Sequence, residues 1–390
     1  MPKILTLALF LLAQQQPTFK SGVELVAVDV HVIDKQGNPI ENIRPDEFEV
    51  SISGRQRRVA SVELVSYTAG RRATTDMPVT DRPASGATGV RPRRMFILAV
   101  DEHSLHASNA LAAVNAAERF IDKLQPDDLV GLYAYPTGTA KHDLTTDHAA
   151  VRRVVRKITG LFEEPASRFN LSPSEIVDIS SGDREMLQTV FRRECRSASS
   201  GCSQGQIQQE ATGLVGFMEM RVSQSVGGLR GLVRGLGEIP GRKILVLVSG
   251  GLISTDRGTG RANSSTEVAH LGREAAIANL SVFALHLDWS YLQSLSSRGG
   301  PRLSYFRDSN MTATGLEIVA GTAGSTVMRV HGTSPDVAFD RVLRETSAHY
   351  LLGVETEAAD RDGNAHAIRV KVKRGGATVR SRSEVVIPKR

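Results

Sequence analysis

The sequence predicts an α/β protein with a mainly parallel sheet, accompanied by β-sandwich-like modules built from the two ends of the chain. Between residues 95 and 347, apolar strands alternate with amphipathic helices, which is typical of an open parallel sheet covered on both faces. The segments before and after this region alternate apolar and polar residues, which indicates strands with one buried face. A chain of 390 residues with 41% hydrophobic residues is long enough for two or three domains with real cores.

The N-terminus predicts export from the cell. Residues 1–13 read MPKILTLALFLLA, which is a basic start, an apolar stretch and a small Ala13 before QQQ. This is the pattern of a secretory signal peptide, and the apolar stretch is too short to span a bilayer. A buried N-terminal helix is the alternative. We therefore expect a secreted or periplasmic protein with no transmembrane segment in the mature chain.

Residues 20–68 form a predicted N-terminal β module. The stretch 23–34 (VELVAVDVHVID) alternates like a strand, residues 34–39 (DKQGNP) are turn-forming, and residues 48–65 supply further strands around Gly54. Residues 69–94 are rich in Pro, Gly, Thr and Arg, with few apolar side chains. Such a segment buries too little surface to order itself, so it is predicted to be a linker.

Residues 95–347 carry the predicted α/β domain. Its predicted strands are 95–100, 129–135, 243–249, 281–287 and 325–330. Its predicted helices are 110–124, 209–236, 270–280, 314–322 and 334–346. A further helix, capped by Thr145 or Thr146, is predicted before the insertion. Residues 162–210 are polar and interrupted by Pro and Gly, so they are interpreted as an insertion.

Residues 348–390 return to β structure. Three strands are predicted, over 349–357, 365–373 and 377–387. Because both ends of the chain are rich in strands, we expect them to pair into one sandwich-like module. The tail from Arg369 to Arg390 holds eight Lys or Arg and one Glu, against a net charge of +6 for the whole chain. Its basic residues alternate with apolar ones, which favours the solvated face of a strand over a nucleic-acid or membrane site.

Cys195 and Cys202 are the two cysteines of the chain. Two thiols cannot build a four-ligand zinc site, and their spacing is not that of a redox CxxC motif. In an exported protein, a disulfide that closes this Ser- and Gly-rich loop is expected. Two free surface thiols are the alternative.

Five segments in a fixed order carry a resemblance to a known family. They are VDVHVIDKQGNPIENIRPDEFEV, MFILAVDEHS, PGRKILVLVSGGL, LEIVAGTAGSTVM and HYLLGVETEAADRDGNAHAIRVKVKR. With these segments the chain resembles secreted bacterial proteins of the von Willebrand factor A-related (VWFA-related) type. The resemblance implies a Rossmann-like vWA domain. In many relatives this domain binds partners through a metal ion at the carboxyl ends of the strands, held by Asp-x-Ser-x-Ser, a Thr and a second Asp.

The first loop keeps one ligand of this implied metal site. Asp101 matches the leading aspartate, whereas His103 and Leu105 stand where the two serines are expected. Ser104 is one place out of register. On an extended segment a shift of one residue turns the side chain to the other side, so Ser104 is expected to face away from the site.

The other two loops match less well. Thr159 and Ser172 are weak candidates for the threonine, and Gly250 stands where the second aspartate is expected. One carboxylate is a poor set of ligands for Mg²⁺, which prefers hard oxygen donors in octahedral geometry. We therefore predict no metal and no other cofactor. A metal-dependent adhesin that binds Mg²⁺ through Asp101, with Ser104 or Thr159, is the alternative.

A hydrolase is the second alternative. The first and fourth strands of the predicted sheet are neighbours, so Asp101, His103 and Ser249 could meet at one edge of the sheet. Ser, His and Asp are the components of an acyl-transfer triad. However, the segment around Ser249 lacks the G-x-S-x-G elbow that exposes a nucleophile in α/β-hydrolases.

The function predicted from the sequence is therefore non-enzymatic recognition of an extracellular or periplasmic protein. No nucleic acid is expected as a partner. The expected binding face lies at the strand ends and is formed by Asp101, His103, Ser104, Ser249 and Gly250.

Overall fold

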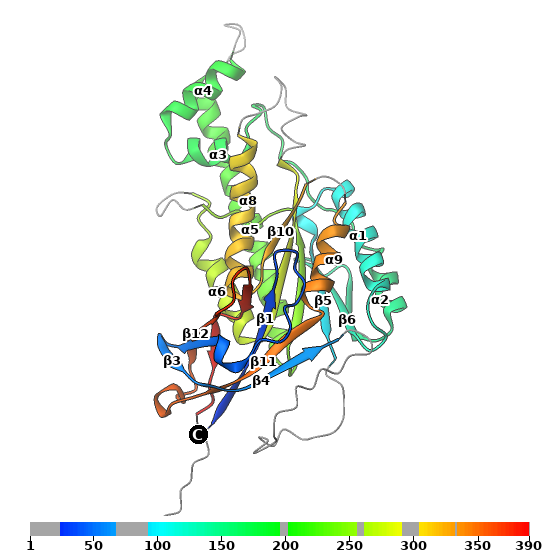
Figure 1. The fold of residues 1–390 in the computed structure, drawn as a ribbon. Helices are drawn as coiled ribbons and strands as arrows, with labels where there is room; N and C mark the ends of the chain where they lie inside the picture. Colours follow the sequence, from blue (N-terminus) through cyan, green and yellow to red (C-terminus); the bar gives the residue numbers. More distant parts are fainter. Residues whose placement is uncertain are drawn as a thin grey trace, which may run out of the picture.

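The computed structural model of the chain describes residues 24–67, 93–195, 202–255, 261–290, 304–331 and 334–389. The predicted signal peptide (1–13) and residues 69–92 of the predicted linker lie outside these ranges. The described residues form a central α/β unit with a smaller β sandwich beside it (Figure 1). Among them, no helix has the length and apolar character needed to cross a membrane.

The central sheet has six strands in the order β10-β9-β8-β5-β6-β7. They are β5 (Met95–Asp101), β6 (Leu129–Tyr135), β7 (Lys141–Thr145), β8 (Lys243–Ser249), β9 (Leu280–Asp288) and β10 (Val327–His331). All pairs are parallel except β6 with β7, so the predicted mainly parallel sheet is confirmed. Every residue of β8 is buried, as expected for a central strand covered on both faces.

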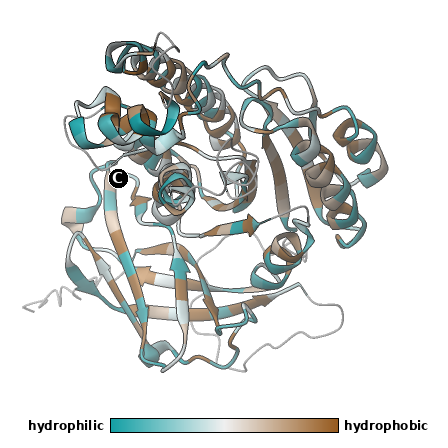
Figure 2. Cartoon of the chain, turned by 90° about the horizontal axis from the view of Figure 1, so that it is seen from above, coloured by the Kyte–Doolittle hydropathy of each residue, from teal (hydrophilic) through white to brown (hydrophobic). Residues whose placement is uncertain are grey.

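Helices cover both faces of this sheet (Figure 2). One face packs against α1 (Ala107–Asp122), α2 (His148–Val155) and α9 (Asp336–Glu345). The other face packs against α5 (Gln204–Gly237), α6 (Ser265–Ile277) and α8 (Tyr305–Thr322). Successive residues of β5 serve the two cores alternately: Phe96 and Leu98 face the first group of helices, and Ile97 and Ala99 face the second.

Three local details differ from the sequence prediction. Helix α2 is capped by Asp147, whose carboxylate accepts a hydrogen bond from the backbone N–H of Ala150 at 2.9 Å. Thr145 instead ends β7, a polar edge strand that the apolar pattern did not predict. Helix α8 starts at Tyr305 and not near residue 314, because its first turns pack with few apolar side chains and therefore show little periodicity.

The insertion over 162–210 contains two helices, α3 (Pro173–Ser180) and α4 (Arg184–Glu194), and the first turns of α5. Ser172 and Glu175 form a capping box at the start of α3, and Asp183 caps α4. The predicted disulfide is confirmed, since Cys195 is bonded to Cys202. These elements share a small apolar cluster of Phe169, Ile179, Val190, Ile207 and Ala211.

The two ends of the chain pair into a β sandwich, as predicted. One sheet has the order β13-β1-β11-β4 and the other β14-β12-β2-β3, so each combines strands from both ends. The strands are β1 (Leu25–Ile33), β2 (Phe48–Ile52), β3 (Arg55–Arg57), β4 (Val59–Ser66), β11 (Ala348–Glu355), β12 (Ala365–Val372), β13 (Thr378–Ser381) and β14 (Glu384–Val386). The single strand expected over 377–387 is two strands, because the chain crosses there from one sheet to the other.

The sandwich packs against the amino-terminal edge of the central sheet. Arg242, just before β8, donates a hydrogen bond to His31 of β1, and His349 of β11 lies 3.3 Å from Asp29. Burial raises the pKa of Asp29, but the hydrogen bond from His349 and the charge of Arg242 outweigh it and lower the pKa to about 2. This arrangement leaves the carboxyl edge of the sheet, where ligands bind in open α/β folds, uncovered by the sandwich.

Candidate functional site

A short 3-10 turn, η2 (Glu102–Ser104), follows β5 and shapes the carboxyl edge. Because the backbone is helical here and not extended, Ser104 turns back toward the strand ends. Its Oγ lies 3.1 Å from Oγ of Ser249 and accepts a hydrogen bond from the backbone N–H of Gly250 at 2.8 Å. The expectation that Ser104 faces away from the site is therefore wrong.

Asp101 lies at the centre of this cluster and is buried. Its Oδ2 accepts hydrogen bonds from the hydroxyls of Ser225 at 2.6 Å and Ser249 at 3.3 Å. Its Oδ1 has no hydrogen-bond partner among the described residues. Burial raises the pKa of Asp101 to about 6, although the serine hydroxyls act in the opposite direction. The sequence did not reveal Ser225, because it lies on α5, far along the chain from Asp101.

Glu102 is a second buried acid that the sequence analysis did not single out. Its carboxylate accepts hydrogen bonds from the hydroxyls of Thr139 and of Thr137 (3.3 Å), and from the backbone N–H of Thr159 at 3.4 Å. Glu102 thus ties the segment between β6 and β7 to the first loop. Thr159 contacts this acid through its backbone and has an exposed side chain. Neither Thr159 nor Ser172, the cap of α3, hydrogen-bonds to Asp101.

The residues at this edge do not fit the Mg²⁺ ion that the family resemblance implies. A Cβ atom at Gly250 would lie 2.1 Å from the backbone oxygen of Ser104, so the second aspartate cannot stand there without moving the η2 turn. Asp101 lines a small cavity whose walls are mostly apolar and which has no room for a water molecule. Within the described ranges, no group of three or more His, Cys, Asp or Glu side chains is placed to hold a metal ion.

The geometry does not assemble the triad considered above. In an acyl-transfer triad the imidazole lies between the acid and the nucleophile. Here Asp101 accepts a hydrogen bond directly from Ser249. The backbone oxygen of His103 accepts from Arg221, but no hydrogen bond joins the His103 ring to Asp101 or Ser249 in the described part of the chain. Ser249 is also buried, which is unsuitable for a nucleophile.

A buried histidine completes the cluster on the neighbouring strand. Nε2 of His286, on β9, lies 3.2 Å from the backbone oxygen of Gly250 and 3.3 Å from Oγ1 of Thr312. Burial lowers the pKa of His286 to about 4, so the ring is neutral at physiological pH. It therefore braces the loop after β8 against α8. A single histidine near the end of a mostly apolar strand is a weak signal for such a role.

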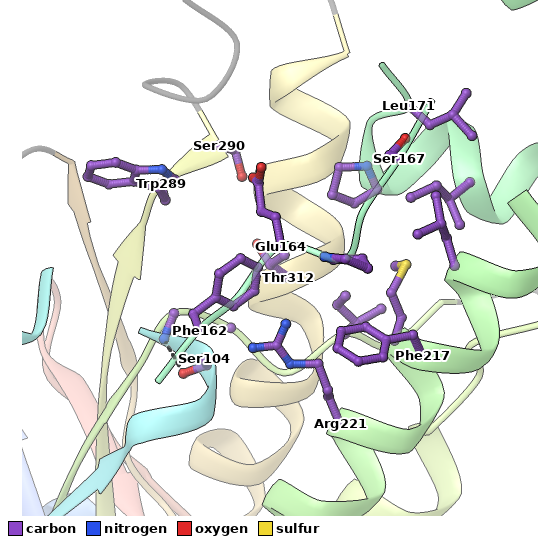
Figure 3. Close-up of a pocket in the computed structure, with 18 of the residues that line it drawn as sticks. Ser104, Phe162, Glu164, Ser167, Leu171, Phe217, Arg221, Trp289, Ser290 and Thr312 are labelled. Atoms are coloured by element: carbon purple, nitrogen blue, oxygen red, sulfur yellow. Dashed lines mark hydrogen bonds between the residues drawn. The ribbon is translucent and has the colours of Figure 1, made fainter. Parts of the chain in front are cut away.

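A pocket of about 500 Å³ opens beside this polar cluster, between the strand ends, α5 and the first part of the insertion. Ser104, Ser225 and Gly250 belong to its lining, whereas Asp101 does not. Aromatic side chains from three different segments, Phe162, Phe217 and Trp289, also line it (Figure 3). The predicted binding-face residues His103, Ser104 and Gly250 therefore border a concave site, while Asp101 and Ser249 lie behind it.

No family model matches the chain, and no curated protein matches it. Among solved structures it is similar to a von Willebrand factor type A protein from Catenulispora acidiphila, with 11% identity over 95% of this chain and 76% of that chain and a TM-score of 0.33. It is also similar to the pilus adhesin SpaC from Lactobacillus rhamnosus GG in its open conformation, with 8% identity over 89% of this chain and 48% of that chain and a TM-score of 0.32. A third similar structure is an NADH-dependent reductase complexed with NAD, with 11% identity over 61% of this chain and 95% of that chain and a TM-score of 0.18.

Proposed function

We propose that this chain is an exported, non-enzymatic protein-recognition module of vWA type, which contacts its partner through the carboxyl edge of the central sheet without a metal ion. The observation that carries the proposal is the buried hydrogen-bond network at that edge, in which Oδ1 of Asp101 alone of the two carboxylate oxygens has no partner among the described residues. The hydroxyls of Ser104, Ser225 and Ser249 bond to each other, to Asp101 or to backbone groups. These hydrogen bonds stabilise the edge, and the cavity beside Asp101 has no room for a water molecule, so a hydrated ion does not fit there.

Exposed apolar side chains support contact at the same edge. Of the seven large hydrophobic side chains that are exposed among the described residues, five belong to segments at this edge: Leu111, Leu161, Met220, Phe306 and Val337. Helices α1, α8 and α9 begin there because each follows a strand of the parallel sheet. Single exposed apolar residues are ordinary, but their concentration at one edge favours a protein contact.

The test compares charged substitutions at the two edges of the sheet. Phe306→Glu and Val337→Glu change exposed side chains at the carboxyl edge, and Ile277→Glu changes an exposed side chain at the amino-terminal edge. Each variant and the wild type are used to capture and cross-link proteins from the exported proteome of the source organism. We expect a partner that the wild type and Ile277→Glu retain and that the two carboxyl-edge variants lose. A partner retained by all variants, or lost only with Ile277→Glu, would refute the proposed face.

The metal-free part of the proposal has a separate test. Thermal melting of the protein is followed during a titration with Mg²⁺ or Mn²⁺ up to millimolar concentration. A bound ion stabilises the folded state by an amount that grows with the logarithm of the ion concentration above the dissociation constant. We expect no rise in melting temperature, and a concentration-dependent rise that Asp101→Ala abolishes would instead favour the metal-dependent adhesin.

A further inference from the structure

The pocket at the carboxyl edge combines apolar side chains with polar ones, and the guanidinium of Arg221 is part of its lining. Its walls include Phe162, Phe169, Leu214, Phe217, Met218 and Trp289. A volume of about 500 Å³ is in the range of sites for small organic ligands. Figure 3 shows the side chain of Arg221 extending from α5 toward Phe162 and Ser104, so its guanidinium lies inside the pocket.

Arg221 is held in place by contacts that do not neutralise its charge. One terminal nitrogen donates a hydrogen bond to the backbone oxygen of His103 and the other to that of Glu163 at 3.4 Å. The guanidinium carbon lies 4.0 Å from the ring centroid of Phe162 and 5.2 Å from that of Phe217. No carboxylate of the described residues lies within ion-pairing distance of Arg221. Since a guanidinium has five donors, part of its fork remains available to a ligand.

Among the described residues no carboxylate forms an ion pair with Arg221, and the buried Asp101 behind the pocket attracts it only at longer range. Glu194 is paired with Arg193 at 2.7 Å. Glu164 is exposed at the rim, as is Arg168. Near the strand ends the lining is formed by neutral polar groups, including Ser104, Ser225 and Thr312. Burial of the guanidinium lowers the pKa of Arg221, and an anion beside a partly desolvated cation is favourable.

We propose that this pocket binds an apolar carboxylate, with the carboxylate on the guanidinium of Arg221 and the apolar body against Phe217, Trp289 and their neighbours. Two sources share this chemistry, a free aliphatic or aromatic acid and the C-terminal hydrophobic residue of a polypeptide. The proposal does not depend on the protein-recognition function, because it concerns the interior of the pocket and not the exposed apolar residues around it.

The test uses the fluorescence of Trp289, which is the only tryptophan of the protein and lines the pocket. Decanoate, decanol and decyltrimethylammonium share one tail and differ in the charge of the head. N-acetylphenylalanine and its amide form a second pair that represents the C-terminus of a polypeptide. We expect saturable quenching or enhancement by the carboxylates, with affinity at least about tenfold higher than for the neutral or cationic member of each set. Stronger binding of decanoate indicates a free acid as the natural ligand, and stronger binding of N-acetylphenylalanine indicates a polypeptide terminus.

Variants separate the charge of Arg221 from its structural role. In Arg221→Gln, binding of decanoate should fall to the level of decanol, while binding of decanol stays within about twofold of the wild type. Arg221→Lys should recover part of the difference, since it keeps the charge but not the fork. Arg234→Gln, an exposed position on the same helix and outside the pocket lining, is the matched control and should bind like the wild type.

Several results would overturn the proposal. They are equal affinity of the wild type for decanoate and decanol, no binding of any carboxylate at millimolar concentration, or unchanged carboxylate preference in folded Arg221→Gln. If Arg221→Gln does not fold, the comparison of charged and neutral probes on the wild type decides.

Discussion

Replacing Asp101 by asparagine should change how the stability of the protein depends on pH. Burial raises the pKa of the Asp101 carboxyl from 3.8 to about 6 in the folded state. Between these two values the folded protein holds this proton more tightly than the unfolded chain does, so the free energy of unfolding falls as the pH rises. A rise of about two pKa units corresponds to about 3 kcal/mol at 1.36 kcal/mol per unit. The destabilisation is complete above the folded-state pKa and absent below about pH 4.

The measurement is chemical unfolding of wild type and Asp101→Asn between pH 4 and pH 7.5. Other groups titrate in this range, so the informative quantity is the difference in unfolding free energy between the two proteins. We expect this difference to move by about 2 to 3 kcal/mol in favour of Asp101→Asn from the acid end to the neutral end. Any constant effect of the amide, such as an unpaired N–H at the Oδ1 position, shifts the whole curve and does not change its slope.

A matched control lies on β9, two strands away from β5 in the central sheet. Burial raises the pKa of Asp288, but the hydrogen bond from Ser309 and the other polar contacts outweigh it and lower the pKa. Asp288→Asn should therefore show the opposite sign, losing stability relative to the wild type as the pH rises from about 2.5 to about 4, and the difference should be nearly flat from pH 4 to 7.5, where that of Asp101→Asn changes. A difference between wild type and Asp101→Asn that does not vary with pH would refute the reasoning. So would a slope that disappears when Mg²⁺ is added, because a bound cation would keep the carboxylate ionised.

Three further predictions concern stability. Gly250→Ala should lower the free energy of unfolding by about 1 to 3 kcal/mol, because its Cβ would meet the backbone of Ser104. Gly227 is an exposed helical position with open space around it, so Gly227→Ala should be neutral or stabilising by up to about 1 kcal/mol. Urea unfolding of both variants measures the difference. Asp29→Asn should lose about 2 kcal/mol at neutral pH, because its folded pKa is lowered to about 2, and the loss should shrink as the pH falls from about 4 toward 2. Replacing both Cys195 and Cys202 by serine should cost about 2 to 3 kcal/mol from the short closed loop, and reduced wild type should melt at the same temperature as this variant.

Some expectations about the protein remain predictions. The predicted signal peptide lies outside the described residues, so export is predicted from the sequence pattern alone. The predicted absence of enzymatic activity is argued from Asp101, His103 and Ser249, which do not form a triad among the described residues. Labelling of Ser249 by a serine-directed fluorophosphonate would contradict this prediction. Neither expectation affects the geometry of the pocket or of the hydrogen-bond network.

Local patterns in the sequence were sufficient for most of the elements. Apolar runs such as 243–249 are buried on both faces wherever they lie in a parallel sheet, and helix periodicity depends only on residues within a few turns. Two missed signals in the insertion were also local, the capping box at Ser172 and Glu175 and the cap at Asp183. The pairing of the two terminal segments was predictable because strands in both segments needed partners.

The site itself depended on tertiary structure. Ser104 faces the strand ends only because η2 is a 3-10 turn. On an extended backbone the Ser104 side chain would point to the opposite side. Ser225 and His286 reach the cluster from other elements, and their positions follow from how α5 and β9 pack on the sheet. The pocket joins Phe162, Arg221 and Trp289. The sequence alone determined which segments form most of the strands and helices, and which residues of the implied metal motif have no counterpart here. Only packing between distant segments decided which side chains meet, because side-chain proximity is set by the global arrangement and not by local periodicity.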